Sequence, residues 1–254
     1  MTDLSGRTVL VTGASKGIGA EITGSLGRAG ASVIAAYNSD DEGALSATAA
    51  IPQERRHLLA LDLSRPGAGR ELWQRAREWR DPIDVVVCNA AVMLDSPLNA
   101  GDAEWDEVWQ RTLSVNVLEP ANLMRSAARD FVAGGGGTLI VLSSWAAQRG
   151  SGNPDLLAYA ASKAAIKSLA QTLARAHAKD GLLVYVVAPG IVRTQMSEIS
   201  AARLGGEEVV TATLAMGEWV PPREIGELVT FLASGTMRHL SGATLDVNGA
   251  SYIR

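Results

Sequence analysis

The sequence predicts a single α/β domain over residues 1–254, built on a doubly wound parallel sheet with helices on both faces. β-Favouring runs alternate with helical stretches along the chain, as in parallel strands joined by crossover helices. The run at 83–88 is almost wholly apolar, which is typical of a strand buried on both faces of a parallel sheet. The length and the 47% hydrophobic content suffice for one large core, and no stretch has the composition of an interdomain linker.

The composition argues against several classes of function. A net charge of −4 with no long basic run disfavours binding to nucleic acid. We find neither a signal sequence nor an apolar run of roughly 18 residues that could cross a bilayer, so we expect a cytoplasmic protein with no membrane partner. The single cysteine, Cys88, lies in an apolar run and should be a buried strand residue. The three histidines lie far apart without metal-ligand spacing, so we expect no catalytic metal.

The first strand, expected at 8–11, leads into a glycine-rich turn and a helix that should end near residue 29. Glycines let the backbone turn tightly and approach a pyrophosphate, while free N–H groups at a helix start attract anions. Such a turn can merely join a strand to a helix, but its position at the start of an α/β chain favours a Rossmann-type dinucleotide site. The spacing does not fit a nucleoside-triphosphate loop. The cofactor contacts expected here are Gly13, Ser15, Lys16, Gly17, Ile18 and Gly19.

The second strand, expected at 32–37, should end beside the adenosine ribose of the cofactor. An acidic side chain there would bind the 2′-hydroxyl of NAD and repel the 2′-phosphate of NADP. This strand ends instead in uncharged donors, including Asn38 and Ser39, and the ammonium of Lys16 could reach the same phosphate. We therefore predict NADP(H) over NAD(H). The acidic residues at 40–42 would count against this if they folded back, and otherwise form a solvated helix start.

The third strand is expected at 58–63, with Asp62 placed either to accept from the adenine amino group or to cap the next helix. That helix should span 69–79, and the buried strand at 83–88 follows it. Further along, Tyr159 and Lys163 stand four residues apart in a helix-favouring run, so they share a helix face. A fixed cation favours the phenolate, which would turn Tyr159 into a general acid or base near neutral pH.

Several separated motifs resemble those of the classical short-chain dehydrogenase/reductase family, over essentially the whole chain and in the same order. Within that family the chain is similar to the 3-oxoacyl-thioester reductases. The motifs are Thr12-Gly13-x3-Gly17-x-Gly19, Asp62-Leu63, Cys88-Asn89-Ala90-Ala91, Asn116, Ser143-Ser144, Tyr159-x3-Lys163, and Pro189-Gly190 with Thr194. One match could be accidental, but seven in register are not.

The resemblance implies a catalytic role for four residues. Tyr159 would transfer the proton, and Lys163 would lower its pKa and bind the nicotinamide ribose. Ser144, with Ser143 as the alternative, would hydrogen-bond the substrate oxygen, and Asn116 would hold a water of the proton relay. Further cofactor contacts are implied for Asp62, Leu63, Asn89, Ala90, Ala91, Pro189, Gly190, Val192 and Thr194.

Three of these residues, Ser144, Asn116 and Thr194, also have a purely structural interpretation. Ser144 could simply end a strand at 138–144, and Asn116 could bond its own helix backbone and bend it. Thr194 could cap the following helix. Two departures from the family pattern are Cys88 and Ala91, where asparagine and glycine are usual. The gap of 15 residues from Ser144 to Tyr159 is longer than in common members, so the loop 148–155 should be reshaped beside the substrate.

The resemblance also implies a cofactor-binding part up to about residue 140 and a catalytic part from 141 onward. A mobile substrate lid should follow Val192 and end before Pro221. Trp145 could line the substrate pocket or only pack. A homotetramer is expected, with a homodimer as the alternative; the helices carrying Trp105 and Tyr159 should form one interface and the tail at 240–249 another.

The sequence thus predicts an NADP(H)-dependent carbonyl reductase or alcohol dehydrogenase that acts on a small ketone or secondary alcohol. One rival is an NAD-dependent sugar or polyol dehydrogenase, which would differ at the adenosine ribose. A rival from another class is a non-catalytic dinucleotide-binding sensor or scaffold. Such a protein need not keep all four catalytic residues, and this chain has them all.

Overall fold

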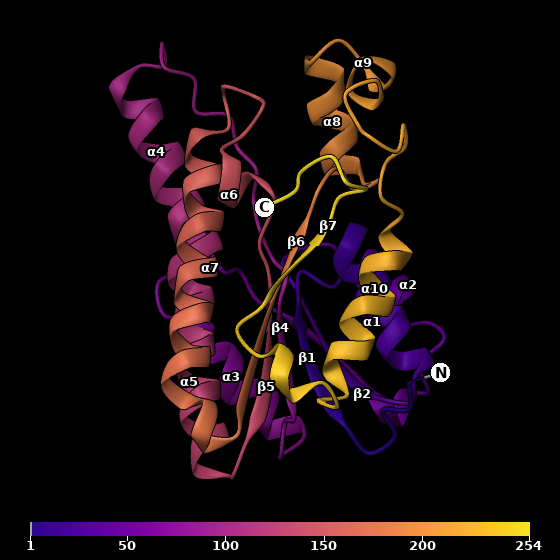
Figure 1. The fold of residues 1–254 in the computed structure, drawn as a ribbon. Coiled ribbons are helices and arrows are strands. Elements are labelled where there is room, and N and C mark those ends of the chain that lie inside the picture. Colours follow the sequence, from indigo (N-terminus) through magenta and orange to yellow (C-terminus); the bar gives the residue numbers. More distant parts are fainter. Residues whose placement is uncertain (1) are drawn as a thin grey trace.

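The computed structural model describes residues 2–254 and contains a seven-stranded parallel sheet with the order β3-β2-β1-β4-β5-β6-β7 (Figure 1). The strands are β1 (Thr8–Thr12), β2 (Ser32–Tyr37), β3 (Arg56–Ala60), β4 (Val85–Cys88), β5 (Gly137–Leu142), β6 (Leu182–Pro189) and β7 (Thr244–Val247). The strand order reverses between β1 and β4, and in such sheets ligands bind at the carboxyl ends of the strands near this switch point. The predicted Rossmann-type doubly wound sheet is confirmed.

Helices cover both faces of the sheet. One face carries α1 (Gly17–Arg28), α2 (Asp41–Ala47) and α10 (Pro222–Ala233); the other carries α3 (Ala68–Trp79), α4 (Asp102–Leu113), α5 (Glu119–Ala133) and α7 (Leu157–His177). Successive strand residues face opposite sides, so Leu10 joins the core under α3, α5 and α7, while Val9 and Val11 join the core under α1 and α10. Cys88 is buried in the former core, as predicted.

The short helices lie mostly in the connections. They are α6 (Ala146–Arg149), α8 (Gln195–Arg203), α9 (Glu207–Thr211), the 3₁₀ turns η1 (Gln53–Arg55), η3 (Ala178–Asp180) and η4 (Arg238–Leu240), and the π-helical turn η2 (Ser114–Leu118). In Figure 1, α8 and α9 rise above the carboxyl ends of the strands, and α6 lies across from them beside α7. None of the helices within residues 2–254 is long and apolar enough to span a membrane.

The third strand differs from the predicted 58–63. β3 is the edge strand and pairs only with β2, from Val33 opposite Arg56 to Tyr37 opposite Ala60. Because β2 ends at Tyr37, the ladder cannot continue to residue 63, and Leu61 makes the last backbone bond, to the Tyr37 carbonyl at 2.8 Å. Asp62 therefore lies in the turn after the strand rather than within it.

Candidate active site

A cavity of about 860 Å³ opens at the carboxyl ends of the strands. It is within the usual size range of ligand pockets. All but one of the residues predicted to bind cofactor or act in catalysis line it. These are Gly13, Ser15, Lys16, Gly17, Ile18, Gly19, Asn38, Ser39, Asp62, Leu63, Asn89, Ala90, Ala91, Ser144, Tyr159, Lys163, Pro189, Gly190, Val192 and Thr194. The exception is Asn116, which is buried beside the cavity.

The glycine turn is shaped by close backbone approach. Gly13 has a φ of +66°, and a Cβ there would lie 2.9 Å from the Cα of Ala90. A Cβ on Gly19 would lie only 1.9 Å from the Gly13 carbonyl oxygen, so no side chain fits. Helix α1 begins at Gly17 without a side-chain cap, which leaves its first N–H groups for an anion. The turn, the opening of α1 and the cavity together fit a dinucleotide.

The segment after β4 is fastened to this turn. The Thr12 hydroxyl accepts from the backbone N–H groups of Asn89 and Ala90, both at 3.0 Å. The Asn89 amide donates to the carbonyls of Thr12 at 3.0 Å and Gly13 at 3.1 Å. These bonds hold the two cofactor-facing segments at a fixed separation.

Lys16, Asn38 and Ser39, which the sequence predicts to contact the adenosine ribose, all line the cavity. Asp40 also lines the cavity, and its carboxylate accepts from the Gly43 N–H at 3.0 Å, which caps α2. The acidic residues at 40–42 therefore start a helix, which was one of the two interpretations of the sequence. The helix starts at the wall of the cavity. The pKa of Tyr37 is raised, first by burial and then by the charge of Asp41.

Asp62 lines the cavity and closes the turn that follows β3. Its carboxylate accepts from the Ser64 N–H and from the Ser64 hydroxyl, both at 2.8 Å. The backbone bond to Ser64 is the main cause that lowers the pKa of this carboxyl. The capping alternative for Asp62 is wrong, because α3 begins at Ala68 and the Gly67 N–H is bound by Glu119 at 2.9 Å.

The proposed catalytic side chains meet at the ends of β5 and α7. Ser143 donates its hydroxyl to the Lys163 carbonyl at 2.9 Å, so it fixes α7 against β5. The Ser144 hydroxyl accepts from the Ala146 N–H at 3.2 Å and lines the cavity beside Tyr159. Lys163 donates its Nζ to the Leu142 carbonyl at 2.8 Å, and this Nζ lies 5.8 Å from the centre of the Tyr159 ring.

Burial dominates the electrostatics of this group. It raises the pKa of Tyr159, and the hydrogen bond with Ser144 opposes that shift. The net direction for Tyr159 is upward and Lys163 is not among its causes, so the lowering by Lys163 that the resemblance implied stays a prediction. Burial also lowers the pKa of Lys163 to about 8 and raises that of the neighbouring Cys88 thiol to about 12.

Asn116 lies in the π-helical turn η2 and is 2% exposed. Its Oδ1 accepts from the Val92 N–H at 2.8 Å, and its Nδ2 donates to the Val92 carbonyl at 2.9 Å and to the Ser162 hydroxyl at 3.0 Å. The alternative in which Asn116 bonds its own backbone is wrong. Its side chain instead ties the segment after β4 to α7, the helix that carries Tyr159.

Two arginines outside the motifs also line the cavity. Arg149 comes from α6, inside the long gap between Ser144 and Tyr159; the gap indicated a reshaped loop but not which of its side chains faces the cavity. Arg111 comes from α4 and lowers the pKa of Asp62 through its charge. Trp145 lines the cavity and also packs against a small cluster formed by Ala201, Val210, Leu214 and Trp219. Thr194 lines the cavity and caps α8 by accepting from the Ser197 N–H at 3.3 Å.

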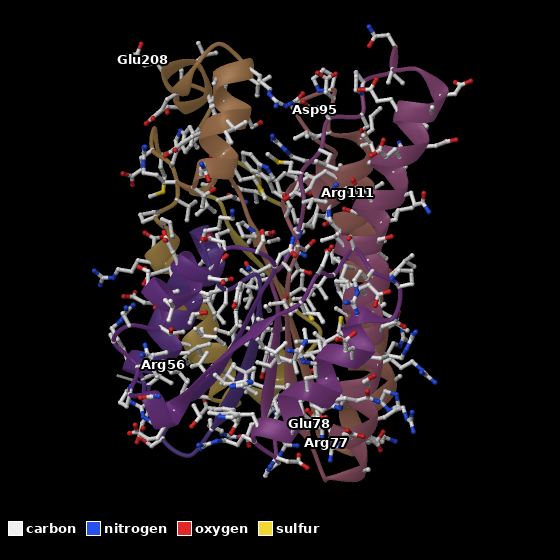
Figure 2. The ribbon with its side chains drawn as sticks, turned by 180° about the vertical axis from the view of Figure 1, so that it is seen from behind. Arg56, Arg77, Glu78, Asp95, Arg111 and Glu208 are labelled. Atoms are coloured by element: carbon white, nitrogen blue, oxygen red, sulfur yellow. The ribbon has the colours of Figure 1, made fainter. Side chains whose placement is uncertain are left out.

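Residues 194–219 are the segment predicted to be a substrate lid and are called the lid below; two contacts join this segment to the rest of the cavity rim. Val192 forms a parallel bridge with Val220, which closes the base of the lid. An ion pair joins Arg203 of α8 to Asp95 in the segment after β4. Figure 2 shows Asp95 at the level of the lid helices and Arg111 lower on α4. No group of three potential metal ligands occurs in the described part of the chain.

The strand order, the glycine turn and the Ser144, Tyr159 and Lys163 group define an NAD(P)-dependent oxidoreductase, and a family model described as enoyl-(acyl carrier protein) reductase matches residues 13–250. The chain belongs to the short-chain dehydrogenase/reductase family.

Relatives and solved structures span nearly the full chain. It is 33% identical to 3beta-hydroxysteroid dehydrogenase 1 of Eggerthella lenta, with 97% of this chain and 94% of the relative covered. It is 30% identical to the 3-oxoacyl-(acyl-carrier-protein) reductase FabG of Escherichia coli K12, with 99% of both chains covered. A crystal structure of a 3-oxoacyl-(acyl-carrier-protein) reductase of Agrobacterium tumefaciens C58 with NADP bound gives a TM-score of 0.87 at 33% identity, covering 97% of this chain and 95% of the other.

Proposed function

We propose that this protein is an NADP(H)-dependent carbonyl reductase, of the 3-oxoacyl-thioester reductase type, that interconverts a ketone and a secondary alcohol. One observation carries the proposal: Ser144, Tyr159 and Lys163 line the same cavity as the glycine turn at Gly13 to Gly19. A dinucleotide laid from that turn toward Ser144 brings its nicotinamide to the two hydroxyl groups.

The chemistry divides between cofactor and protein. NADP(H), when bound, supplies or accepts the hydride. Ser144 and Tyr159 donate hydrogen bonds to the carbonyl oxygen, where negative charge grows as the carbon is reduced. Tyr159 then gives up its proton to that oxygen, and the ammonium of Lys163 stabilises the phenolate that remains. Asn116 positions the helix segments that hold Tyr159 and the residues after β4, and a water at this point would continue the proton relay.

The preference for NADP(H) rests on Lys16, Asn38 and Ser39 at the ribose end of the cavity and on the NADP-bound relative. Asp40 at the same wall favours the second candidate, an NAD-dependent sugar or polyol dehydrogenase. Titration with NADPH and with NADH, followed by nicotinamide fluorescence, separates the two. We expect tighter binding of NADPH, and Lys16→Ala should weaken NADPH much more than NADH. Tighter binding of NADH by the wild type would overturn the preference.

The catalytic role is tested by Tyr159→Phe. Loss of a positioned acid or base costs about 10²- to 10⁴-fold in rate, so kcat should fall by that range while NADPH binding stays within about twofold. Tyr252→Phe, on a tyrosine outside the cavity lining, is the matched control and should leave kcat unchanged. Near-normal turnover by Tyr159→Phe would refute the proton-transfer role.

We also propose a cytoplasmic homotetramer, in keeping with the family resemblance. Large apolar side chains are exposed on α7 and its surroundings (Leu118, Leu157) and on and after α10 (Phe231, Met237). Light scattering on a sizing column should give about four times 26.6 kDa. A mass of one or two chains would refute the tetramer, and cell fractionation tests the compartment.

A further inference from the structure

The part of the cavity beyond Ser144 carries a group of large apolar side chains. Side chains from the lid and from the segments after β4 and β5 line it: Met93, Leu156, Met196, Ile199, Leu204 and Val210. Three of them stay well exposed although they line the cavity, namely Met196 at 41%, Ile199 at 51% and Leu204 at 40%. Apolar surface that faces a cavity without a protein partner favours an apolar ligand. Uncharged polar side chains also line the cavity here, among them Ser151, Asn153, Gln195, Ser200 and Thr213.

One charged side chain interrupts this apolar wall. The charged residues among the described lining are Lys16, Asp40, Asp62, Arg111, Arg149 and Lys163. The first four belong to the cofactor end, and Lys163 belongs to the catalytic group. Arg149 alone comes from α6, one helical turn beyond Trp145 and Ser144. The substrate end of the cavity therefore has one cation and no carboxylate among these residues.

Arg149 is held in place but has no polar partner. Its guanidinium lies 4.2 Å from the centre of the Trp145 ring. Two other arginines stack on tryptophans, and both are also hydrogen-bonded: Arg80 to the Ser32 hydroxyl at 3.0 Å, and Arg193 to Glu207 at 2.8 Å. Within residues 2–254 the Arg149 side chain makes no hydrogen bond or ion pair. Its planar fork of donors is thus free to bind an anion.

The short helix that carries Arg149 is anchored at both ends. The Trp145 N–H donates to the Pro189 carbonyl at 3.0 Å, which joins α6 to β6. The Gln148 amide donates to the Asp246 carboxylate at 2.8 Å, and Arg254 binds the same carboxylate at 2.8 Å. These contacts fix the position of α6 relative to Ser144. A four-residue helix rises by about 6 Å, so only a few carbons would separate the reacting carbonyl from a group bound by Arg149.

We propose that the substrate is a ketone or secondary alcohol with an apolar body and an anionic end, a carboxylate or a phosphate, that Arg149 binds. This rests on the proposed function, because the reacting carbonyl is placed at Ser144 and Tyr159. The apolar body lies against the inner face of the lid, and the anion reaches the guanidinium stacked on Trp145. Arg149 is then the residue that selects anionic substrates over neutral ones.

The experiment compares 5-oxohexanoate, its neutral amide and a keto-alkyl phosphate of similar length as substrates with NADPH. Wild type should favour at least one anion over the amide in kcat/KM. Arg149→Met should lower kcat/KM for that anion by about 10- to 100-fold, as expected for lost bonds to a charged group, and change the amide by less than threefold. For the anion, kcat/KM of Arg149→Lys should lie between the values of wild type and Arg149→Met. The control is Arg80→Met, which removes a stacked arginine outside the cavity and should change kcat/KM for neither the anion nor the amide.

The anion with the higher kcat/KM shows whether the anionic end of the substrate is a carboxylate or a phosphate ester. No preference for either anion, or an equal loss for anion and amide in Arg149→Met, would overturn the inference. Calorimetric titration of the Tyr159→Phe protein, saturated with NADPH, gives a readout that does not need turnover. The anion should bind there more tightly than the amide, and Arg149→Met should abolish the difference. If that difference is found but no ketone is reduced by wild type, the proposed reaction fails and the anion site stands.

Discussion

Thr12→Val tests whether one buried hydroxyl fixes the cofactor turn. Thr12 is 2% exposed, and its hydroxyl serves the N–H groups of Asn89 and Ala90 at 3.0 Å each. Valine has nearly the same shape but accepts no hydrogen bond, so both donors lose their partner. An unsatisfied buried donor costs about 1–3 kcal/mol. Because Asn89 and Ala90 are only partly buried, the penalty is smaller than for two fully buried donors, and we expect the free energy of unfolding to fall by about 1–3 kcal/mol in total.

Urea unfolding, followed by circular dichroism, measures this loss. Thr12→Ser is the control, since it keeps the hydroxyl and should lose less than half as much. Affinity for NADPH should fall in the valine variant as well, because the segment at 89–91 would no longer be held against Gly13. A loss below about 1 kcal/mol, or equal losses for serine and valine, would refute the assigned role of the hydroxyl.

Two further predictions concern buried charges. The unfolded-state pKa of a lysine is near 10.5 and that of Lys163 in the fold is about 8, so between these pH values only the unfolded chain holds the proton. The stability of wild type relative to Lys163→Met should therefore rise from pH 8 to pH 10.5, by about 3 kcal/mol in total, and a flat difference would contradict the shift. Glu119 accepts from Gly67 at 2.9 Å and from Gly69 at 2.8 Å with separate oxygens, and an amide keeps only one acceptor. Glu119→Gln should lower the free energy of unfolding by about 2 kcal/mol, whereas the exposed Glu78→Gln should change it by less than about 0.5 kcal/mol; equal effects would refute the capping role.

The parts of the site that lie close together in the chain could be predicted from the sequence. The glycine turn at 13–19 is a local pattern, because glycines at this spacing indicate a tight turn, and the turn lies where it was expected. Tyr159 and Lys163 share a face because helix geometry fixes it at four residues apart. The patterns that indicate strands and helices are also local, so their alternation along the chain was enough to predict the sheet.

Features that depend on distant partners could not be predicted. The bonds from Asn116 to Val92 join positions 24 residues apart, and nothing near Asn116 signals them. β3 ends at Ala60 because its neighbour ends, although the apolar pattern runs on to Leu63. Whether Arg149 faces the cavity depends on how α6 is anchored to β6 and Asp246, and a charged residue on a short helix gives no hint of this.

Cys88 lies in β4, at the middle of the sheet, where the charge on Lys163 acts on the pKa of its thiol. With its pKa near 12, almost none of the thiol is ionised at neutral pH, and burial keeps reagents away. Labelling by a maleimide therefore requires the sheet to open, so its rate measures the opening of the core directly. A cysteine introduced on the lid would react alone in the folded protein, and lid motion could be followed by a single dye without removing the native thiol.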